Sequence, residues 1–375
     1  MAFTSAFRKR CAIIPAILLI AVTLACGGGG SHANAFLRGG GSWEKVNTPP
    51  GANQISFVDF SRDGHWFIAD RNQGFYRSAD QGASWTQVNS GIATTFGWTI
   101  NANPFNGDLI ASLFSPGGLN SSPVIFYRSA NGGNTWSAIP FGHLSSATAW
   151  TGCAFPANGN IVCGGYWAPS PKTGGWISTN GGLSTTTVST ASTNSGSVYA
   201  LALNPVTNDL WMGTEQNGIF RSTDNGLTWR AASPAATSVD PAHGIQDTNI
   251  YAITFDVHGN VLFGSQGGIW KSSNSGSGYR WTNVLNNPNT AAGEGLGRDA
   301  NGVLYYGHKH DNHDATVVRC STDDGRTWQA CDSGLPPGLQ VHRFVVNPSD
   351  GKLYAVIGND LSLNGALYRT GSPVQ

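Results

Sequence analysis

The chain repeats one eight-residue motif six times, at intervals of about 50 residues, and this repeat constrains its fold more than any other feature. The copies share Ser at the first position, Asp or Asn at the third, Gly at the fifth and, in most of them, a closing Trp. They begin at Ser78, Ser129, Ser178, Ser222, Ser272 and Ser321. The third copy has Thr185 in place of Trp, and the fifth has an insertion before Trp281. A length of about 330 residues would by itself suggest two domains, but the repeat predicts a single array of similar units.

The motif is typical of a tight turn between two strands. An Asp or Asn side chain accepts hydrogen bonds from turn amides, and Gly adopts a conformation that other residues resist. Around each copy the same four short apolar or alternating segments recur. They are clearest in Val198–Leu203, Leu210–Thr214, Ile219–Ser222 and Thr228–Ala231. Four antiparallel strands per repeat make a propeller blade, so we interpret the motif as structural and without a catalytic role.

We therefore predict an all-β fold, a single seven-bladed β-propeller of four-stranded antiparallel blades. The blades are expected at residues 54–88, 95–139, 146–188, 195–232, 248–284, 290–331 and 339–375. The last blade stops after Tyr368 and Arg369 without the motif or an outer strand, whereas Gly41–Val46 is similar to the second half of the first motif. The N-terminal segment is thus predicted to complete the C-terminal blade, which removes the open edges of the array.

The pattern S-x-[DN]-x-G-x-[ST]-W resembles the Asp-box of the BNR propeller superfamily, and the resemblance covers nearly the whole mature chain. The superfamily includes sialidase-like, xyloglucanase-like and photosystem II assembly-factor-like propellers. A sialidase is disfavoured, because its three converging arginines and its Arg-Ile-Pro motif are not evident. The basic residues that precede the motifs recur from blade to blade and are read as scaffold: Arg77, Arg128, Arg221, Lys271 and Arg369.

The N-terminus predicts export. Residues 1–25 combine Arg8, Lys9 and Arg10 with an apolar run that is too short for a membrane span. The sequence around Cys26, followed by four glycines, resembles a bacterial lipobox. This implies a lipid on Cys26, a flexible tether over residues 26–42 and the propeller over residues 43–375. Cleavage near Ala33 or Ala35 is the alternative, and it would give a secreted protein.

The other four cysteines predict disulfides, because an even number in an exported chain favours pairing. Cys153 and Cys163 flank one predicted turn, and Cys320 and Cys331 flank another. Charged residues are 11% of the chain and the formal net charge is zero, which gives no footprint for nucleic acid. We expect a monomer that contacts a membrane only through its N-terminal lipid.

Candidate binding residues are those in which the blades differ. Counting back from the first turn of each blade gives one ring at the start of the innermost strands: Ser56, Trp98, Trp150, Tyr199, Tyr251, Glu294 and His342. The aromatic residues form either a stacking surface for sugar rings or an apolar partner, or they are packing contacts between blades. A second ring follows the second strands: Asp70, Phe114, Tyr166, Glu215, Gln266, Lys309 and Gly358.

Blade six carries a loop with three histidines and two aspartates. The histidines are His308, His310 and His313. Imidazole and carboxylate groups suit a divalent metal, whereas Lys309 opposes a cation, so a solvated polar loop is the alternative reading. No other cofactor is expected.

Two functions fit this pattern. The first is a binding module that holds a glycan or an envelope protein on its loop-rich face. The resemblance to assembly factors with one Asp-box propeller implies the architecture only, because the basic patch of that family is not evident. The second is an enzyme. Phe67–Ser78 resembles the first-blade segment of xyloglucanase-like hydrolases, which implies a catalytic Asp70, but the family's partner carboxylate lies on a second propeller that this sequence does not contain. Glu215 or Glu294 would then replace it, or His342 or His310 would act as the base of a lyase.

Overall fold

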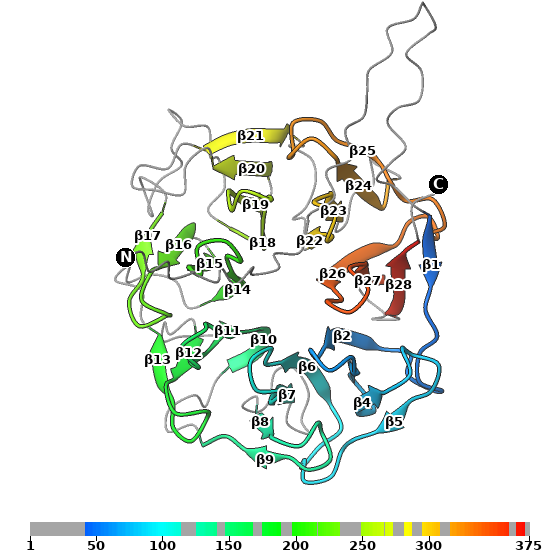
Figure 1. The fold of residues 1–375 in the computed structure, drawn as a ribbon, viewed down its shortest axis with the longest axis vertical. Helices are drawn as coiled ribbons and strands as arrows, with labels where there is room; N and C mark the ends of the chain where they lie inside the picture. The colour runs from blue at the N-terminus through cyan, green and yellow to red at the C-terminus, as the bar shows by residue number, and fades with distance from the viewer. Residues whose placement is uncertain are drawn as a thin grey trace, which may run out of the picture. The chain divides into compact units, whose positions relative to one another are not determined.

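The structure is a computed structural model that describes residues 42–113, 125–140, 147–167, 175–188, 197–215, 217–232, 249–265, 267–272, 281–286, 295–307, 316–359 and 365–371. Every regular element in this part is a β-strand. The strands form seven four-stranded antiparallel sheets that surround a common centre (Figure 1). The predicted all-β, seven-bladed propeller is confirmed. Within the described residues, no helix is long and apolar enough to span a membrane.

The sheets follow the chain in order, and the innermost strand of each comes first. Blade 1 holds β2 (Ile55–Phe60), β3 (Trp66–Asp70), β4 (Gly74–Ser78) and β5 (Thr86–Gln87). Blade 2 holds β6 (Gly97–Ala102), β7 (Leu109–Leu113), β8 (Ile125–Ser129) and β9 (Ser137–Ala138). Blade 3 holds β10 (Ala147–Ala154), β11 (Ile161–Trp167), β12 (Gly175–Ser178) and β13 (Thr186–Val188). Blade 4 holds β14 (Val198–Leu203), β15 (Leu210–Thr214), β16 (Ile219–Ser222) and β17 (Arg230–Ala231).

The remaining three blades repeat this order. Blade 5 holds β18 (Ala252–Phe255), β19 (Val261–Ser265), β20 (Gly268–Ser272) and β21 (Trp281–Asn286). Blade 6 holds β22 (Gly295–Arg298), β23 (Leu304–Gly307), β24 (Val318–Ser321) and β25 (Gln329–Ala330). Blade 7 holds β26 (Gln340–Val346), β27 (Leu353–Gly358), β28 (Ala366–Thr370) and, as its outer strand, β1 (Trp43–Lys45).

The ring closes through β1, as the sequence predicted. Trp43 pairs with Thr370 and Lys45 with Tyr368, so the first and last strands lie side by side (Figure 1). The Trp43 side chain is buried, and its indole Nε1 donates a 2.7 Å hydrogen bond to the carbonyl oxygen of Cys331 in blade 6. The ring of Trp43 also stacks on Phe344 at a centroid distance of 5.9 Å. One side chain therefore joins blade 6 to blade 7.

The repeated motif folds into the same turn, which we call the box turn, in all five copies that the structure describes. In the first copy, the Ser78 hydroxyl accepts the Gly82 N–H at 2.8 Å, and the Asp80 carboxylate accepts the Ser84 N–H at 2.8 Å. The same two bonds recur in the copies that begin at Ser129, Ser178, Ser222 and Ser321. Gln81, at φ 59°, and Gly82, at φ 86°, both have left-handed backbone. This conformation explains the invariant glycine.

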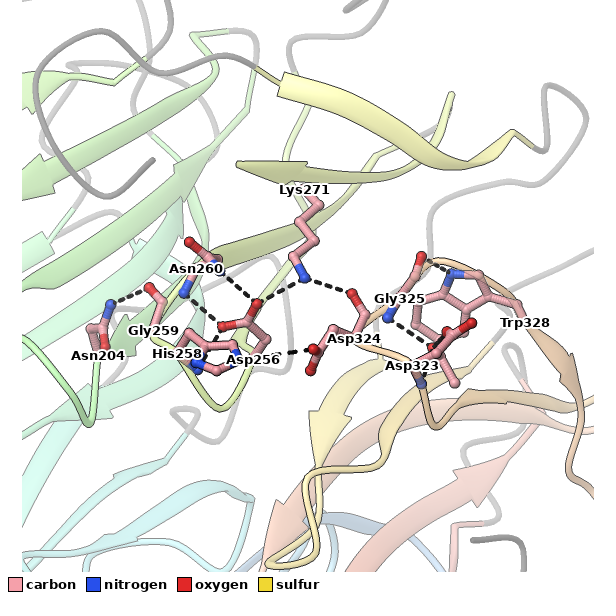
Figure 2. Close-up of polar contacts among 11 residues, drawn as sticks. Asn204, Asp256, His258, Gly259, Asn260, Lys271, Asp323, Asp324, Gly325 and Trp328 are labelled. Carbon is pink, nitrogen blue, oxygen red and sulfur yellow. Dashed lines mark hydrogen bonds and ion pairs between the residues drawn. The ribbon is translucent and has the colours of Figure 1, made fainter. Parts of the chain in front are cut away.

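Box turns and first hairpin turns lie on one side of the ring, which we call the box face. In a four-stranded meander, the first and third connections share one edge of the sheet. Contacts between neighbouring blades place these edges on a common side. Figure 2 shows this at blades 4 to 6. There Asn204 Nδ2 donates to the Gly259 carbonyl oxygen at 2.9 Å, and Lys271 Nζ lies 2.8 Å from Asp256 and 2.6 Å from the Asp324 carbonyl oxygen. Lys271, the basic residue that precedes the fifth copy of the motif, therefore holds blade 5 against blade 6.

Both predicted disulfides are present. Cys153 and Cys163 face each other across β10 and β11, and Cys320 in β24 is bonded to Cys331, which follows β25. Disulfides persist in oxidising compartments, which agrees with an exported protein. The predicted signal peptide, Cys26 and most of the tether lie outside the described residues.

Candidate functional site

The innermost strands begin on the other side of the ring, which we call the mouth face, and most of them begin with the same irregularity. The pairing register shifts by one residue in blades 1, 2, 4 and 7. The extra residues are Ser56, Trp98, Tyr199 and His342. In blade 5, Tyr251 donates its N–H to Gly264, which pairs with the next residue, and so occupies the same position. A bulge redirects the side chain of the extra residue. The structure thus brings five of the seven residues counted from the sequence to equivalent points.

The predicted ring is displaced by one residue in blade 3. Trp150 pairs regularly with Gly165, and the register shift falls between Trp150 and Gly152, so Thr151 is the extra residue there. Blade 3 carries a second shift, between Ala147 and Ala149, that counting from the first turn could not reveal. Glu294 and the side chain of Trp150 lie outside the described part.

An arginine covers one face of the first aromatic residue in this ring. The guanidinium carbon of Arg71 lies 3.8 Å from the centroid of the Trp98 ring, within the range of a cation–π contact. Trp98 itself is half-buried. Below it, the Ser56 hydroxyl donates to the Trp98 carbonyl oxygen at 2.8 Å. Blades 1 and 2 therefore share a fixed edge at the mouth.

Asp70 holds the turn that positions Arg71. Its side chain is fully buried, and its carboxylate accepts the N–H groups of Gln54, Asn72 and Gln73 at 2.9, 2.9 and 3.0 Å. The three backbone donors occupy both carboxylate oxygens and hold the side chain in place. Such bonds are typical of a residue that fixes a loop, because they occupy the oxygens that a proton donor or a nucleophile would need.

Glu215 occupies the position of Arg71, one residue beyond that of Asp70. The Arg71 N–H donates to Gln54 and the Glu215 N–H donates to Ser197, each just before the innermost strand of its blade. Thr214 is therefore the counterpart of Asp70, and the two carboxylates that the sequence aligned are not equivalent. Gly358, in the same predicted ring, pairs with Gln340. Phe114, Gln266, Lys309 and the side chain of Tyr166 lie outside the described part.

Two tyrosines from adjacent blades form a second aromatic contact. Tyr199 and Tyr251 stack with centroids 5.1 Å apart and an interplanar angle of 16°. Both side chains are half-buried. Tyr199 is the extra residue of the bulge in blade 4 and Tyr251 holds the same position in blade 5, so the pair needs no rearrangement to present an aromatic surface.

One residue further into the ring, the blades carry small side chains with two exceptions. The residues that follow the bulge position in blades 1 to 5 and 7 are Phe57, Thr99, Gly152, Ala200, Ala252 and Arg343. The guanidinium carbon of Arg343 lies 3.8 Å from the centroid of Phe57. A Cβ atom on Gly152 would lie 3.4 Å from Phe57 and 3.6 Å from both terminal nitrogens of Arg343. The two large side chains thus reach from blades 7 and 1 towards blade 3.

Asp59 is the acidic residue whose charge acts on Arg343. Burial raises the pKa of its carboxyl group, while N–H donation from Ala102 and Phe60 and the charge of Arg343 act in the opposite direction. Burial also lowers the pKa of Arg343 to about 10, and the charge of Asp59 opposes this shift. The comparison of blades missed both residues because it stopped at the first position of each strand. Arg343 lies one residue beyond His342 and Asp59 lies three residues beyond Ser56, so a comparison carried three residues further would have reached both.

The predicted metal loop, with His308, His310 and His313, lies outside the described residues. In the part that the structure describes, no group of three or more His, Cys, Asp or Glu side chains could hold a metal ion.

Comparison with known proteins places the fold. No family model matches the chain and no curated protein matches it. Among solved structures, the extracellular domain of BT4673 from B. thetaiotaomicron matches 88% of this chain and 40% of its own, at a TM-score of 0.59 and 13% identity. YCF48 from Cyanidioschyzon merolae matches 87% of this chain and 98% of its own, at a TM-score of 0.59 and 13% identity. Virginiamycin B lyase from Staphylococcus aureus matches 88% of this chain and 99% of its own, at a TM-score of 0.62 and 13% identity.

These identities are low enough that the matches show the propeller fold alone. The chain spans about two fifths of the BT4673 extracellular domain, and nearly the full length of the other two proteins.

Proposed function

We propose that the protein is an exported binding propeller, which holds a glycan or an envelope protein on its mouth face. The observation that carries this proposal is the repeated bulge at the start of the innermost strands. It positions Trp98, Tyr199 and His342 in blades 2, 4 and 7, and Tyr251 holds the same position in blade 5. Regular strand pairing alone would not require a bulge at each of these positions, and bulges are common where a side chain must be redirected towards a ligand.

The chemistry of the mouth face suits recognition. Trp, Tyr and Arg are the residue types that dominate binding energy at protein interfaces, and aromatic faces also stack on sugar rings. Arg71 on Trp98 and the Tyr199–Tyr251 pair are already assembled, so little ordering entropy is lost on binding. A propeller of this architecture can hold a polypeptide, since one of the matched structures is YCF48 bound to a D1 peptide.

Binding is favoured over catalysis by the surroundings of the candidate acids. Asp70 is occupied by three backbone amides, and Glu215 lies at a different position in its blade. The alternative, an enzyme on polysaccharide, then rests on Glu294 and His342. A reducing-sugar assay distinguishes this enzyme from a binding module.

We further propose that a lipid on Cys26 anchors the protein in the cell envelope. The lipobox-like sequence and the two disulfides support this location. The tether over residues 26–42 would then leave the propeller free to reorient.

The proposal is tested by binding to a glycan array and by crosslinking in envelope fractions, with one variant and one control. The variant Tyr199→Ala/Tyr251→Ala removes the stacked pair. The control His65→Ala removes a partly exposed ring on the box face of blade 1. We expect ligand or crosslink to be lost in the first and retained in the second. Equal binding by both proteins would refute the assignment to the mouth face.

A reducing-sugar assay over plant and bacterial polysaccharides decides between binding and catalysis. Sugar release that disappears in Glu294→Gln or Asp70→Asn would replace the binding proposal with a hydrolase. His342→Gln tests a lyase in the same way, with unsaturated ends as the product measured.

A further inference from the structure

Exposed apolar side chains are concentrated on the box face of blades 2 to 5. Five of the six large hydrophobic residues that are exposed in the described part of the chain lie there, and we call them the apolar arc. They are Phe105, Leu183, Val206, Leu227 and Val257, with exposed fractions of 53, 71, 57, 59 and 45%. The sixth, Phe96, directly precedes β6 and so lies on the mouth side. An apolar surface of this kind marks a site of contact.

The blades themselves show that these residues are not required by the turns. Phe105 and Val206 occupy the third position of an Asn-Pro-x turn, where blade 7 has Ser349. Leu183 and Leu227 occupy the sixth position of the box turn, where the first and second copies have Ala83 and Asn134. The same turns therefore form with small or polar residues elsewhere in the ring.

Contacts between blades hold turns of blades 3, 4 and 5 beside one another on this face. Asn160 Nδ2 donates to the Asn225 carbonyl oxygen at 3.0 Å, which links the first turn of blade 3 to the box turn that carries Leu227. Val206 lies against the next blade, since a Cβ atom on Gly259 would be 3.0 Å from it. Three acidic side chains beneath the arc form ion pairs: Asp108 with Arg128, Asp209 with Arg221 and Asp256 with Lys271. Asp224, in the box turn that carries Leu227, accepts hydrogen bonds from the Ser222 and Thr228 hydroxyls.

The chain also enters the ring on this face. Thr370 ends β28 beside the first turn of blade 7, where its hydroxyl accepts the Leu353 N–H at 3.1 Å. Trp43 pairs with Thr370, and the Ser42 carbonyl oxygen accepts the Gly371 N–H at 2.8 Å. Residues 27–41, which separate Ser42 from Cys26, would span roughly 20 Å as a flexible coil. A lipid on Cys26 would therefore hold a membrane within reach of the box face.

We infer that the apolar arc is a second membrane contact, beyond the N-terminal lipid that the sequence alone predicted. It rests on the lipid bilayer and points the mouth face away from it. Turn tips that carry aliphatic and aromatic side chains on one face can enter the boundary between headgroups and acyl chains. The contact itself depends on the arc, while the direction of the tether rests on the proposed anchoring at Cys26. A ligand would then approach the mouth face without obstruction by the bilayer.

Vesicle flotation tests the contact without the anchor. Residues 42–375 contain all the strands and the closure of the ring, and are mixed with vesicles of phosphatidylethanolamine and phosphatidylglycerol. Val206→Asp/Leu227→Asp alters the arc, and Ser349→Asp/Ala83→Asp places the same charges at the equivalent turn positions of blades 7 and 1, outside the arc. We expect the partition coefficient to fall by about tenfold or more in the arc variant and to change by less than about twofold in the control.

Three outcomes would overturn the inference. They are a wild-type protein that does not float with the vesicles, equal loss in the two variants, and a dimer in sedimentation equilibrium that only the arc variant dissociates. The last result would assign the arc to a second copy of the chain.

The orientation is tested on the full chain after export and purification in its processed form. A fluorophore on Leu227→Cys should be quenched by a nitroxide-labelled lipid, whereas one on Asn72→Cys, on the mouth face, should not. Equal quenching at the two sites would overturn the orientation. Mass spectrometry of Cys26 tests the anchor independently, so its failure is distinguishable from that of the contact surface.

Discussion

Replacing Trp43 with Ala tests whether the ring depends on its N-terminal strand. Trp43 is 3% exposed, and a buried tryptophan removes roughly 150–250 Å² from water. At about 25 cal/mol per Å², that burial corresponds to about 4–6 kcal/mol. Measured Trp→Ala losses of about 3–5 kcal/mol agree with this range, and the bond from the indole to Cys331 adds about 1 kcal/mol. We therefore expect the free energy of unfolding to fall by about 4–5 kcal/mol.

Trp85 provides a matched control, because it belongs to the box turn of blade 1 and is only half-buried. Its indole donates to the Asn47 carbonyl oxygen at 3.2 Å at an exposed position, so Trp85→Ala should cost about 1–2 kcal/mol. The assay is urea unfolding of each variant, monitored by circular dichroism. If Trp43→Ala does not fold, Trp43→Phe can be measured instead. It retains much of the packing while losing the indole bond, so its free energy of unfolding should lie between those of wild type and of Trp43→Ala. A loss in Trp43→Ala no larger than that in Trp85→Ala would refute closure through this residue.

Three further predictions concern the turns and the disulfides. Gln81 has a left-handed φ of 59°, so Gln81→Gly should leave the free energy of unfolding unchanged or raise it by up to about 1 kcal/mol; a clear loss in urea unfolding would contradict the strain argument. Hydrogen bonds from Ser84 lower the pKa of Asp80 to about 2. The stability that Asp80 contributes is therefore present above its unfolded pKa of about 4 and is lost as the pH falls towards 2, so the urea midpoints of wild type and Asp80→Asn should converge between those values rather than stay parallel. Finally, Cys153→Ser/Cys163→Ser opens a loop with a sequence separation of 10 and should lower the free energy of unfolding by about 2–3 kcal/mol, whereas an unchanged midpoint would mean that the paired strands hold the loop without the bond.

The orientation of the protein bears on how the mouth face works. If the box face rests on the membrane, the Arg71–Trp98 contact and the Tyr199–Tyr251 pair point towards the space beyond it. Tethering then concentrates the binding site near the membrane surface without adding any contact to the ligand.

The sequence by itself determined the architecture. The box motif fixes a turn within eight residues, and its repetition fixes a unit that cannot bury its faces alone, so the number and order of the blades follow from spacing. Closure through Trp43 and the pairing of Cys153 with Cys163 were also predictable, because each completes a pattern already visible in a neighbouring repeat or across a single turn.

Only the tertiary structure decided what meets at the centre. Arg71 and Trp98 come from different blades, as do Tyr199 and Tyr251, and Arg343 and Phe57. Which of these side chains meet depends on single-residue bulges, and a bulge shifts the register without leaving a mark in composition or periodicity. That is why the sequence misplaced Trp150 by one residue. Glu215 was also aligned with Asp70, whereas strand pairing makes Thr214 the counterpart of Asp70. Local turns are encoded by adjacent residues, whereas contacts across the ring depend on the register of strands far apart in the chain.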